Sequence, residues 1–229
     1  LHSEPRGTLK VSASVAFGTL HIAPALPELL ATYPDLHVDM TIGDRFVDLV
    51  DEGYDVAVRI VGAPEGHLVA RKLAPIRRTL CATPEYLRRR GIPQTPYDLA
   101  HHNCLHYTPV SAHGVWRFQG PAGDIAVPVS GDLRINDDEA LSHAVLGGLG
   151  VALLPTFIVG EALQTGRLVA VLSKYLPLER YVYAVYSPSR HVPAKVRAFI
   201  DFLVARFGPE PYWDRPAQPP GARPAAASS

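Results

Sequence analysis

The segment HHNCLH, residues 101–106, concentrates side chains that can ligate a metal ion. It holds three histidines and a cysteine, which are residue types that bind zinc. The chain has no second cluster at ligand spacing to complete such a site. A strand through CLHY would also send Cys104 and His106 to one face, while His101 and His102 precede it in a turn. We therefore expect no metal ion here.

The glycine-rich segment LGGLGVALLP, residues 146–155, raises the question of a phosphate-binding loop. A dinucleotide fingerprint reads Gly-x-Gly-x-x-Gly and follows a strand, whereas here the third glycine is missing and a predicted helix comes first. The uncharged run 140–160 is long enough to span a membrane, but it contains His143 and Pro155 and follows a capped helix start. A helix ending at the glycines, followed by a buried strand, explains every residue and needs no membrane.

Patterns for nucleophilic or redox chemistry are weak. The chain has no Gly-x-Ser-x-Gly segment, so no nucleophile elbow is indicated. Cys81 and Cys104 are too few for a disulfide framework, and a reducing cytoplasm is the expected location. We interpret both as buried small hydrophobes, with a redox-sensing pair as the alternative. The sequence predicts no catalytic residue and no cofactor.

Length and composition indicate a soluble globular protein. The 229 residues are 47% hydrophobic and carry 22 basic and 22 acidic side chains. Without a basic excess, the chain is not expected to bind nucleic acid by itself. No signal peptide is visible, and because the chain begins with Leu1 we expect a further segment upstream in the whole protein.

Strands and helices alternate along the first sixty residues. Strand candidates 8–15, 37–42 and 55–60 are separated by helical segments 20–33 and 45–52, the second capped by Asp44 and ended by Gly53. This order predicts a parallel sheet with right-handed crossovers. A second α/β unit follows, and its expected elements are a helix 137–147 capped by Asn136, a strand 151–154, a helix 156–164 and a strand 167–172. A strand 181–187 and an amphipathic helix 192–207 come after it.

Polar residues lie where these strands end. Ligands of open α/β sheets bind outside the carboxyl ends of the strands. This rule selects the segments 12–14, 43–44 and 59–60. The helix after Ser14 also offers free backbone N–H groups, which suit an anion.

Five segments together resemble the effector-binding domain of LysR-type transcriptional regulators. The resemblance spans about residues 7–205 and rests on GTLKVSASVAFGTLHIAPALPELLATYPDL, DRFVDLVDEGYDVAVRI, LCATPEYL, GLGVALLP and KVRAFIDFL. It implies an α/β fold of the type II periplasmic-binding-protein kind, with two α/β subdomains joined by two crossing strands. By this resemblance, residues 1–82 with 185–208 form subdomain I and 83–184 form subdomain II. The tail 209–229 is rich in proline and is expected to be disordered. The family's N-terminal winged helix-turn-helix domain is absent from this sequence.

The resemblance also implies an effector site in the cleft between the subdomains. The residues carried over onto this sequence are Ser14, Asp44, Arg59, His106, Asn136 and Asp137, with Pro155 on the wall. Each has a structural alternative. Ser14, Asp44 and Asn136 could be helix caps only. Arg59 could pair with Asp55 or Asp44, and His106 could be a buried structural histidine.

We carry three hypotheses for function. The first is the effector-sensing domain of a cytoplasmic LysR-type regulator, which binds a small molecule, meets DNA only through the missing domain and does not contact a membrane. Arg59 and the helix start hint at an anionic effector. The alternatives are an extracytoplasmic solute-binding protein and an enzyme on a two-lobed α/β fold. The apolar helix 20–33 further predicts a homodimer or higher homo-oligomer, with Leu26 and Leu30 at the interface.

Overall fold

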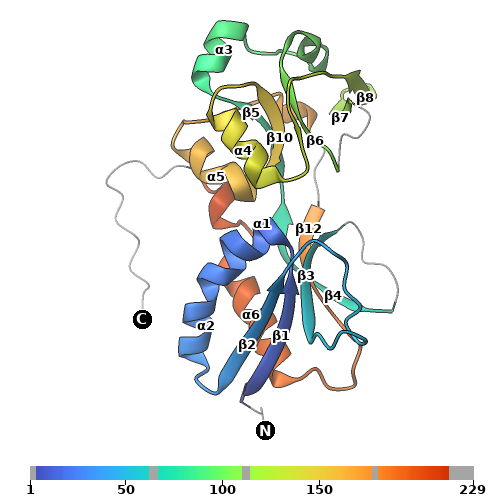
Figure 1. Cartoon of the computed structure of the whole chain (residues 1–229), viewed down its shortest axis with the longest axis vertical. Helices are drawn as coiled ribbons and strands as arrows, with labels where there is room; N and C mark the ends of the chain where they lie inside the picture. Colours follow the sequence, from blue (N-terminus) through green and yellow to red (C-terminus); the bar gives the residue numbers. More distant parts are fainter. Residues whose placement is uncertain (1–3, 62–66, 110–113, 177–179, 217–229) are drawn as a thin grey trace.

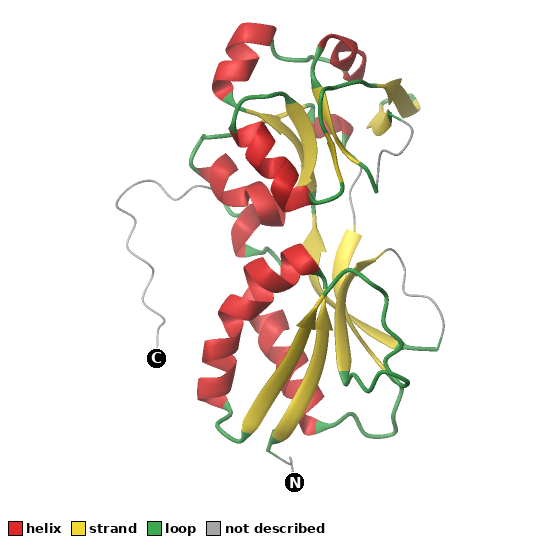
Figure 2. Ribbon diagram, viewed as in Figure 1, coloured by secondary structure: helices red, strands yellow, loops and turns green. Residues whose placement is uncertain are grey.

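Two α/β subdomains stacked end to end make up the protein (Figure 1). The computed structural model describes residues 4–61, 67–109, 114–176 and 180–216. Over these residues the strands form two five-stranded sheets and a two-stranded hairpin. Figure 2 shows one sheet, flanked by helices, in each subdomain. The predicted fold class is confirmed.

The sheet of subdomain I has the strand order β2-β1-β3-β12-β4. Its strands are β1 (Gly7–Ala13), β2 (Leu36–Ile42), β3 (Val56–Val61), β4 (Val69–Ile76) and β12 (Arg180–Tyr186). β1 pairs in parallel with β2 and β3, as the sequence predicts. β12 runs antiparallel to both β3 and β4, so the complete sheet is mixed.

A single helical stretch follows β1 and begins five residues earlier than predicted. It consists of α1 (Val15–Phe17), a π-helical turn (Gly18–Ile22), a 3-10 turn (Ala23–Ala25) and α2 (Leu26–Thr32). The irregular turns accompany Pro24 and Pro27, which lack backbone N–H donors. By length and composition the stretch could cross a membrane. Its buried residues pack with α6 (Ala194–Phe207) into the core of subdomain I, which accounts for the apolar face without a membrane.

Subdomain II is built on a sheet of strand order β11-β5-β10-β6-β9. Its strands are β5 (Arg78–Ala82), β6 (Cys104–Tyr107), β9 (Arg134–Ile135), β10 (Val151–Pro155) and β11 (Val169–Val171), and β7 (Val115–Gly120) pairs with β8 (Gly123–Pro128) as a hairpin. Its helices are α3 (Pro84–Arg90), α4 (Asp138–Leu146) and α5 (Thr156–Gln164), with 3-10 turns at Pro96–His101 and Ser173–Tyr175. Two hydrophobic clusters fill this subdomain.

The segment LGGLGVALLP is the predicted joint between a helix and a strand. α4 ends before Gly147, and Gly148 adopts φ +77°, a left-handed conformation that glycine adopts without strain. A Cβ atom at Gly150 would lie 2.2 Å from the carbonyl oxygen of Asn103. The glycine therefore lets β10 approach the start of β6.

The predicted helix 45–52 is wrong. This segment consists of turns, because its polar side chains bond locally. The Asp48 carboxylate accepts from the backbone N–H groups of Val50 and Asp51, and Arg45 pairs with Glu52. Asp44, which the sequence predicted as the cap of this helix, accepts a hydrogen bond from the Val15 backbone N–H instead.

The structure places both subdomain boundaries earlier than predicted. β5 belongs to the second sheet and β12 to the first, so the chain crosses at Arg77 rather than after residue 82 and has returned by Arg180 rather than after residue 184. Only one residue separates β4 from β5. No turn residue marks the crossing, which explains why the sequence pattern missed it.

The expected disorder of the tail 209–229 is also corrected in part. Residues 209–216, called here the C-terminal segment, are ordered and contain a 3-10 turn at Tyr212–Asp214. Trp213 is only 5% exposed and packs in the core of subdomain I. Residues 217–229 lie outside the described part of the chain.

Candidate functional site

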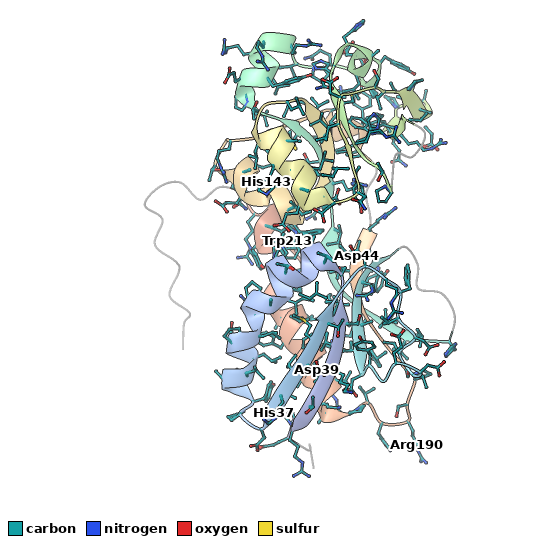
Figure 3. All side chains as sticks on the ribbon, in the orientation of Figure 1. His37, Asp39, Asp44, His143, Arg190 and Trp213 are labelled. Carbon is teal, nitrogen blue, oxygen red and sulfur yellow. The ribbon has the colours of Figure 1, made fainter. Side chains whose placement is uncertain are left out.

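A cavity of about 460 Å³ lies between the two subdomains, and we call it the cleft. Its walls come from the end of β1, the loop after β2, β3, the crossing strands and the segments around residues 107, 137 and 155. Six of the seven residues proposed from the sequence line it, namely Ser14, Asp44, Arg59, Asn136, Asp137 and Pro155. In Figure 3, Asp44 lies at the level where the subdomains meet.

His106 is the exception, and its assignment to the site is corrected. It is 2% exposed within subdomain II, and its ring lies 5.9 Å from the ring of Trp116. Burial and the positive charge of Arg134 lower the pKa of His106. The side chain lies in the interior and is not among the residues that line the cleft.

The subdomain I wall is organised by the N-terminus of α1. Asp44 Oδ1 accepts a hydrogen bond of 2.9 Å from the Val15 backbone N–H. Ser14 is the N-cap residue, but its side chain makes no capping bond, and its Oγ is buried without a partner. The helix start expected to receive an anion is thus already occupied by Asp44.

Arg59 contributes a buried cation to the same wall. Its guanidinium donates to the backbone oxygens of Val58 and Arg45 and to Ser12 Oγ, which are all neutral acceptors. Burial lowers its pKa, but an arginine remains charged. The structural alternative, an ion pair of Arg59 with Asp55 or Asp44, is not formed among the described residues: Asp55 pairs with Lys195 at 2.6 Å, and Asp44 caps α1.

The subdomain II wall holds two charged residues that the sequence interpretation missed, Arg78 and Asp138. Arg78 lies opposite Pro155 in the β5–β10 pairing and donates to the Leu153 carbonyl oxygen at 2.8 Å. Its Nε is buried without a hydrogen-bond partner. Neither a motif nor a spacing identifies this arginine, because its burial depends on the pairing of strands far apart in sequence.

Asp138 follows the residue that caps α4. Asp137, rather than the predicted Asn136, is the N-cap, and its Oδ1 accepts from the Ala140 backbone N–H at 2.7 Å. Asp138 Oδ1 is buried and has no hydrogen-bond partner. Burial raises the pKa of Asp138 to about 6, Arg78 opposes this shift, and the carboxylates of Asp137 and Asp44 add to it.

Buried polar atoms without partners distinguish the cleft from the other hollows. Five such side-chain atoms occur among the described residues, and three of them belong to residues that line the cleft: Ser14 Oγ, Arg78 Nε and Asp138 Oδ1. Native proteins leave few such groups unpaired, and each one requires a partner or an explanation. Residues of both subdomains that line the cleft therefore carry a buried polar atom without a hydrogen-bond partner.

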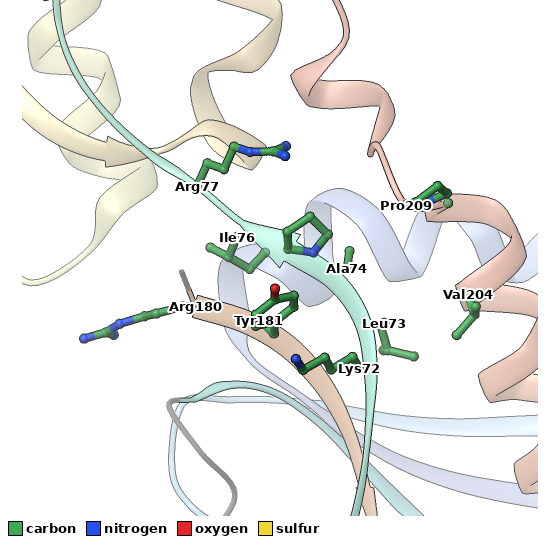
Figure 4. Close-up of a pocket in the computed structure, with 11 residues that line it drawn as sticks. Lys72, Leu73, Ala74, Ile76, Arg77, Arg180, Tyr181, Val204 and Pro209 are labelled. Atoms are coloured by element: carbon green, nitrogen blue, oxygen red, sulfur yellow. The ribbon is translucent and has the colours of Figure 1, made fainter. Parts of the chain in front are cut away.

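A second cavity, of about 520 Å³, lies beside the crossing strands (Figure 4). Its walls are mainly apolar, and the Lys72 ammonium lies 4.0 Å from the centre of the Tyr181 ring. Arg77 and Arg180 also line this cavity, and their side chains point in opposite directions in Figure 4. A third hollow, of about 910 Å³, surrounds His101 and His102. Neither hollow is lined by a described residue with an unpartnered buried polar atom, so the cleft is the better candidate.

An aromatic cluster forms the wall of the cleft next to the C-terminal segment. Phe17 and Phe157 line the cleft and stack edge to face at 5.3 Å, and Trp213 packs on Phe17 at 5.7 Å. His21 bonds to the Phe157 carbonyl oxygen at 2.7 Å and to the Tyr212 hydroxyl at 2.6 Å. The C-terminal segment thus contacts both subdomains next to the site.

The described residues offer no group of three or more potential metal ligands. Cys81 and Cys104 are free and buried, and burial raises the pKa of both thiols to about 12. A thiolate is the reactive form of cysteine. The redox-pair alternative therefore finds no support in these positions.

Comparison with known sequences gives a consistent group of relatives. The family model described as the LysR substrate binding domain matches residues 2–208. An uncharacterized HTH-type transcriptional regulator of Haemophilus influenzae is 37% identical over 196 residues, covering 86% of this chain and 68% of that protein. The HTH-type transcriptional regulator DmlR of Escherichia coli K12 is 38% identical over 204 residues, covering 89% and 66%. The chain thus spans about two thirds of the length of these relatives.

Solved structures show the same architecture. The regulatory domain of CrgA from Neisseria meningitidis, a LysR-type transcriptional regulator, superposes with a TM-score of 0.77 at 27% identity, covering 89% of this chain and 100% of that one. The regulatory domain of AphB from Vibrio vulnificus gives a TM-score of 0.74 at 28% identity, covering 87% and 98%.

Proposed function

The chain belongs to the LysR-type transcriptional regulators, as their effector-binding regulatory domain, and from this we propose that it binds a small polar effector in the cleft and thereby controls DNA binding by the whole protein. LysR regulatory domains bind small-molecule effectors, and the family is not enzymatic. A transcriptional regulator of this family acts inside the cell.

One observation favours the cleft over the other two hollows as the effector-binding site. Its three unpartnered polar atoms come from both subdomains, with Ser14 on one wall and Arg78 and Asp138 on the other. A ligand that satisfies them must touch both subdomains at once. Its binding would therefore favour one angle between the subdomains over others.

We propose that this angle is transmitted through a homodimer. Leu26 and Leu30 are half-buried and pack partly against the core of their own subdomain, on a helix that also carries exposed residues. Replacement of Leu30 by glutamate would place a charge in a buried contact and split the dimer. Sedimentation of the chain at micromolar concentration, with and without this change, tests the pairing, and a wild-type monomer would contradict it.

The binding proposal is tested by titrating the ¹⁵N-labelled chain with a library of small metabolites. We expect binders to shift amide signals near residues 14–17, 78, 136–140 and 155–157. Arg59→Met should weaken binding of an anionic ligand by roughly 10- to 150-fold, and Lys72→Met, beside the second cavity, is the matched control. Binders that shift only signals outside the cleft would refute the proposal.

A further inference from the structure

The chemistry of the three open positions in the cleft narrows the class of ligand. Arg78 Nε–H is a donor on a cation, Asp138 Oδ1 is an acceptor on a carboxyl group, and the Ser14 hydroxyl can do either. A ligand that fits must offer an acceptor and a donor together.

Three of the other charged groups on the walls are already engaged, whereas Arg180, which also lines the cleft, forms no ion pair among the described residues. The Asp44 and Asp137 carboxylates cap α1 and α4, and the Arg59 guanidinium donates to three neutral oxygens. Among the described residues, neither Arg59 nor Arg78 forms an ion pair with a carboxylate. The cleft therefore retains cationic groups on both walls without an anionic partner.

Arg78 and Asp138 lie on the same wall and influence each other without pairing. Each is the largest single charge acting on the other's pKa, yet no ion pair joins them. Neither charge is therefore neutralised by a direct contact with the other.

We propose that the cleft selects a small organic acid that carries a hydrogen-bond donor, a hydroxyl or an ammonium group, beside its carboxylate. The carboxylate accepts from Arg78 Nε–H, the neighbouring donor meets Asp138 Oδ1, and Ser14 Oγ binds the ligand from the opposite wall. This inference rests on the proposed function and specifies the ligand of the same site.

Other ligand classes fit less well. An apolar molecule would leave Arg78 Nε and Asp138 Oδ1 without partners, which is costly for charged groups. A plain carboxylic acid would satisfy Arg78 but present no donor to Asp138. A simple cation would meet Asp138 but add to the positive charge of Arg59 and Arg78.

The experiment compares propionate, lactate and alanine, which share a three-carbon skeleton and differ only in the group beside the carboxylate. Amide shifts of the ¹⁵N-labelled chain at pH 7.5, where Asp138 is ionised, report both affinity and location. We expect lactate or alanine to bind in the cleft at least about 10-fold more tightly than propionate, because hydrogen bonds to charged groups have that effect. Preference for lactate assigns the hydroxyl, and preference for alanine assigns the ammonium group.

Two variants complete the test. Arg78→Met should weaken binding of the preferred acid about 10-fold or more, and Asp138→Asn should reduce its advantage over propionate. Arg167→Met, at an exposed arginine far from the cleft, is the matched control. Equal binding of all three acids in the cleft, or unchanged affinity in both variants, overturns this inference but leaves the proposed function intact. Absence of binding by any of the three overturns the inference as well, and the metabolite titration then judges the function separately.

Discussion

The two sides of the crossing strands differ in how many of their buried polar groups have hydrogen-bond partners. On the side of the C-terminal segment, His21 bonds to Phe157 and Tyr212, and Arg77 meets Asp214 at 2.8 Å. In the cleft, Ser14 Oγ, Arg78 Nε and Asp138 Oδ1 remain without partners. Both sides share Phe17 and Phe157 as a common wall.

This difference indicates a structural role for the side of the C-terminal segment and a ligand-binding role for the cleft. Most polar groups on the side of the C-terminal segment are paired with each other, with Trp213 Nε1 and Arg206 Nε as exceptions among the described residues, so that side holds the subdomains together. The Gln164 amide adds bonds to the Tyr212 and Arg215 carbonyl oxygens. The three polar atoms named above in the cleft have no hydrogen-bond partner, as expected of a site that binds a polar ligand.

The largest expected effect is on the packed side. Trp213→Ala removes a 5% exposed indole that contacts Phe17 and Phe207, and should lower the free energy of unfolding by about 3–5 kcal/mol. Urea unfolding measures this change. Tyr97→Ala, at an exposed aromatic residue, is the control and should have little effect. A similar loss in both variants would show that the C-terminal segment contributes nothing special.

A smaller loss is expected from the ion pair at the crossing. Asp214 is a nearly buried carboxylate, with its side chain 6% exposed, that accepts from Arg77. Asp214→Asn should lower the free energy of unfolding by about 2 kcal/mol, since the negative charge that pairs with Arg77 is removed while the amide oxygen can still accept. Asp201→Asn breaks an exposed pair with Arg71 and should change stability by less than about 1 kcal/mol. Equal effects of the two changes would contradict the special role of this pair.

In the cleft, removing a charged group should raise the free energy of unfolding instead of lowering it. The pKa of Asp138 is raised from 3.8 to about 6, with Arg78, Asp137 and Asp44 as the facing charges, so its ionisation destabilises the folded state as pH rises through this interval. Asp138→Asn should therefore stabilise the ligand-free protein by about 1–2 kcal/mol at pH 8 and change little at pH 3.5. Thermal unfolding at both pH values measures the difference. Destabilisation at pH 8 would mean that Asp138 has a structural partner.

The smallest effect concerns His21. The Phe157 carbonyl can only accept, so Nε2 carries the proton and Nδ1 accepts from Tyr212. Burial lowers the pKa of His21, so its stabilising contribution is present above pH 6.5 and is lost as pH falls toward the lowered value. We expect stability to decline by up to about 1 kcal/mol between pH 6.5 and 5, and the decline to be weaker in His21→Asn. Identical pH profiles would contradict this assignment.

The sequence predicted the parts of the site that local rules determine. Strand ends and helix starts placed Ser14, Asp44, Arg59 and Asp137 on the cleft, because ligands of open sheets bind there. It missed Arg78 and Asp138, since their burial depends on how β5 pairs with β10 and how the two subdomains face each other. It also missed Trp213, because a proline-rich segment has no periodic pattern even when one aromatic residue anchors it.

The central claim is that a ligand occupies the open hydrogen-bonding positions of the cleft. The most direct measurement is the Arg78 Nε–H signal of the arginine-labelled chain, recorded alone and with saturating lactate or alanine, with Arg78→Met providing the assignment. The account predicts that this signal shifts and that its exchange with water slows when the acid binds, because Nε–H gains an acceptor. An unchanged Arg78 signal at saturation would contradict it.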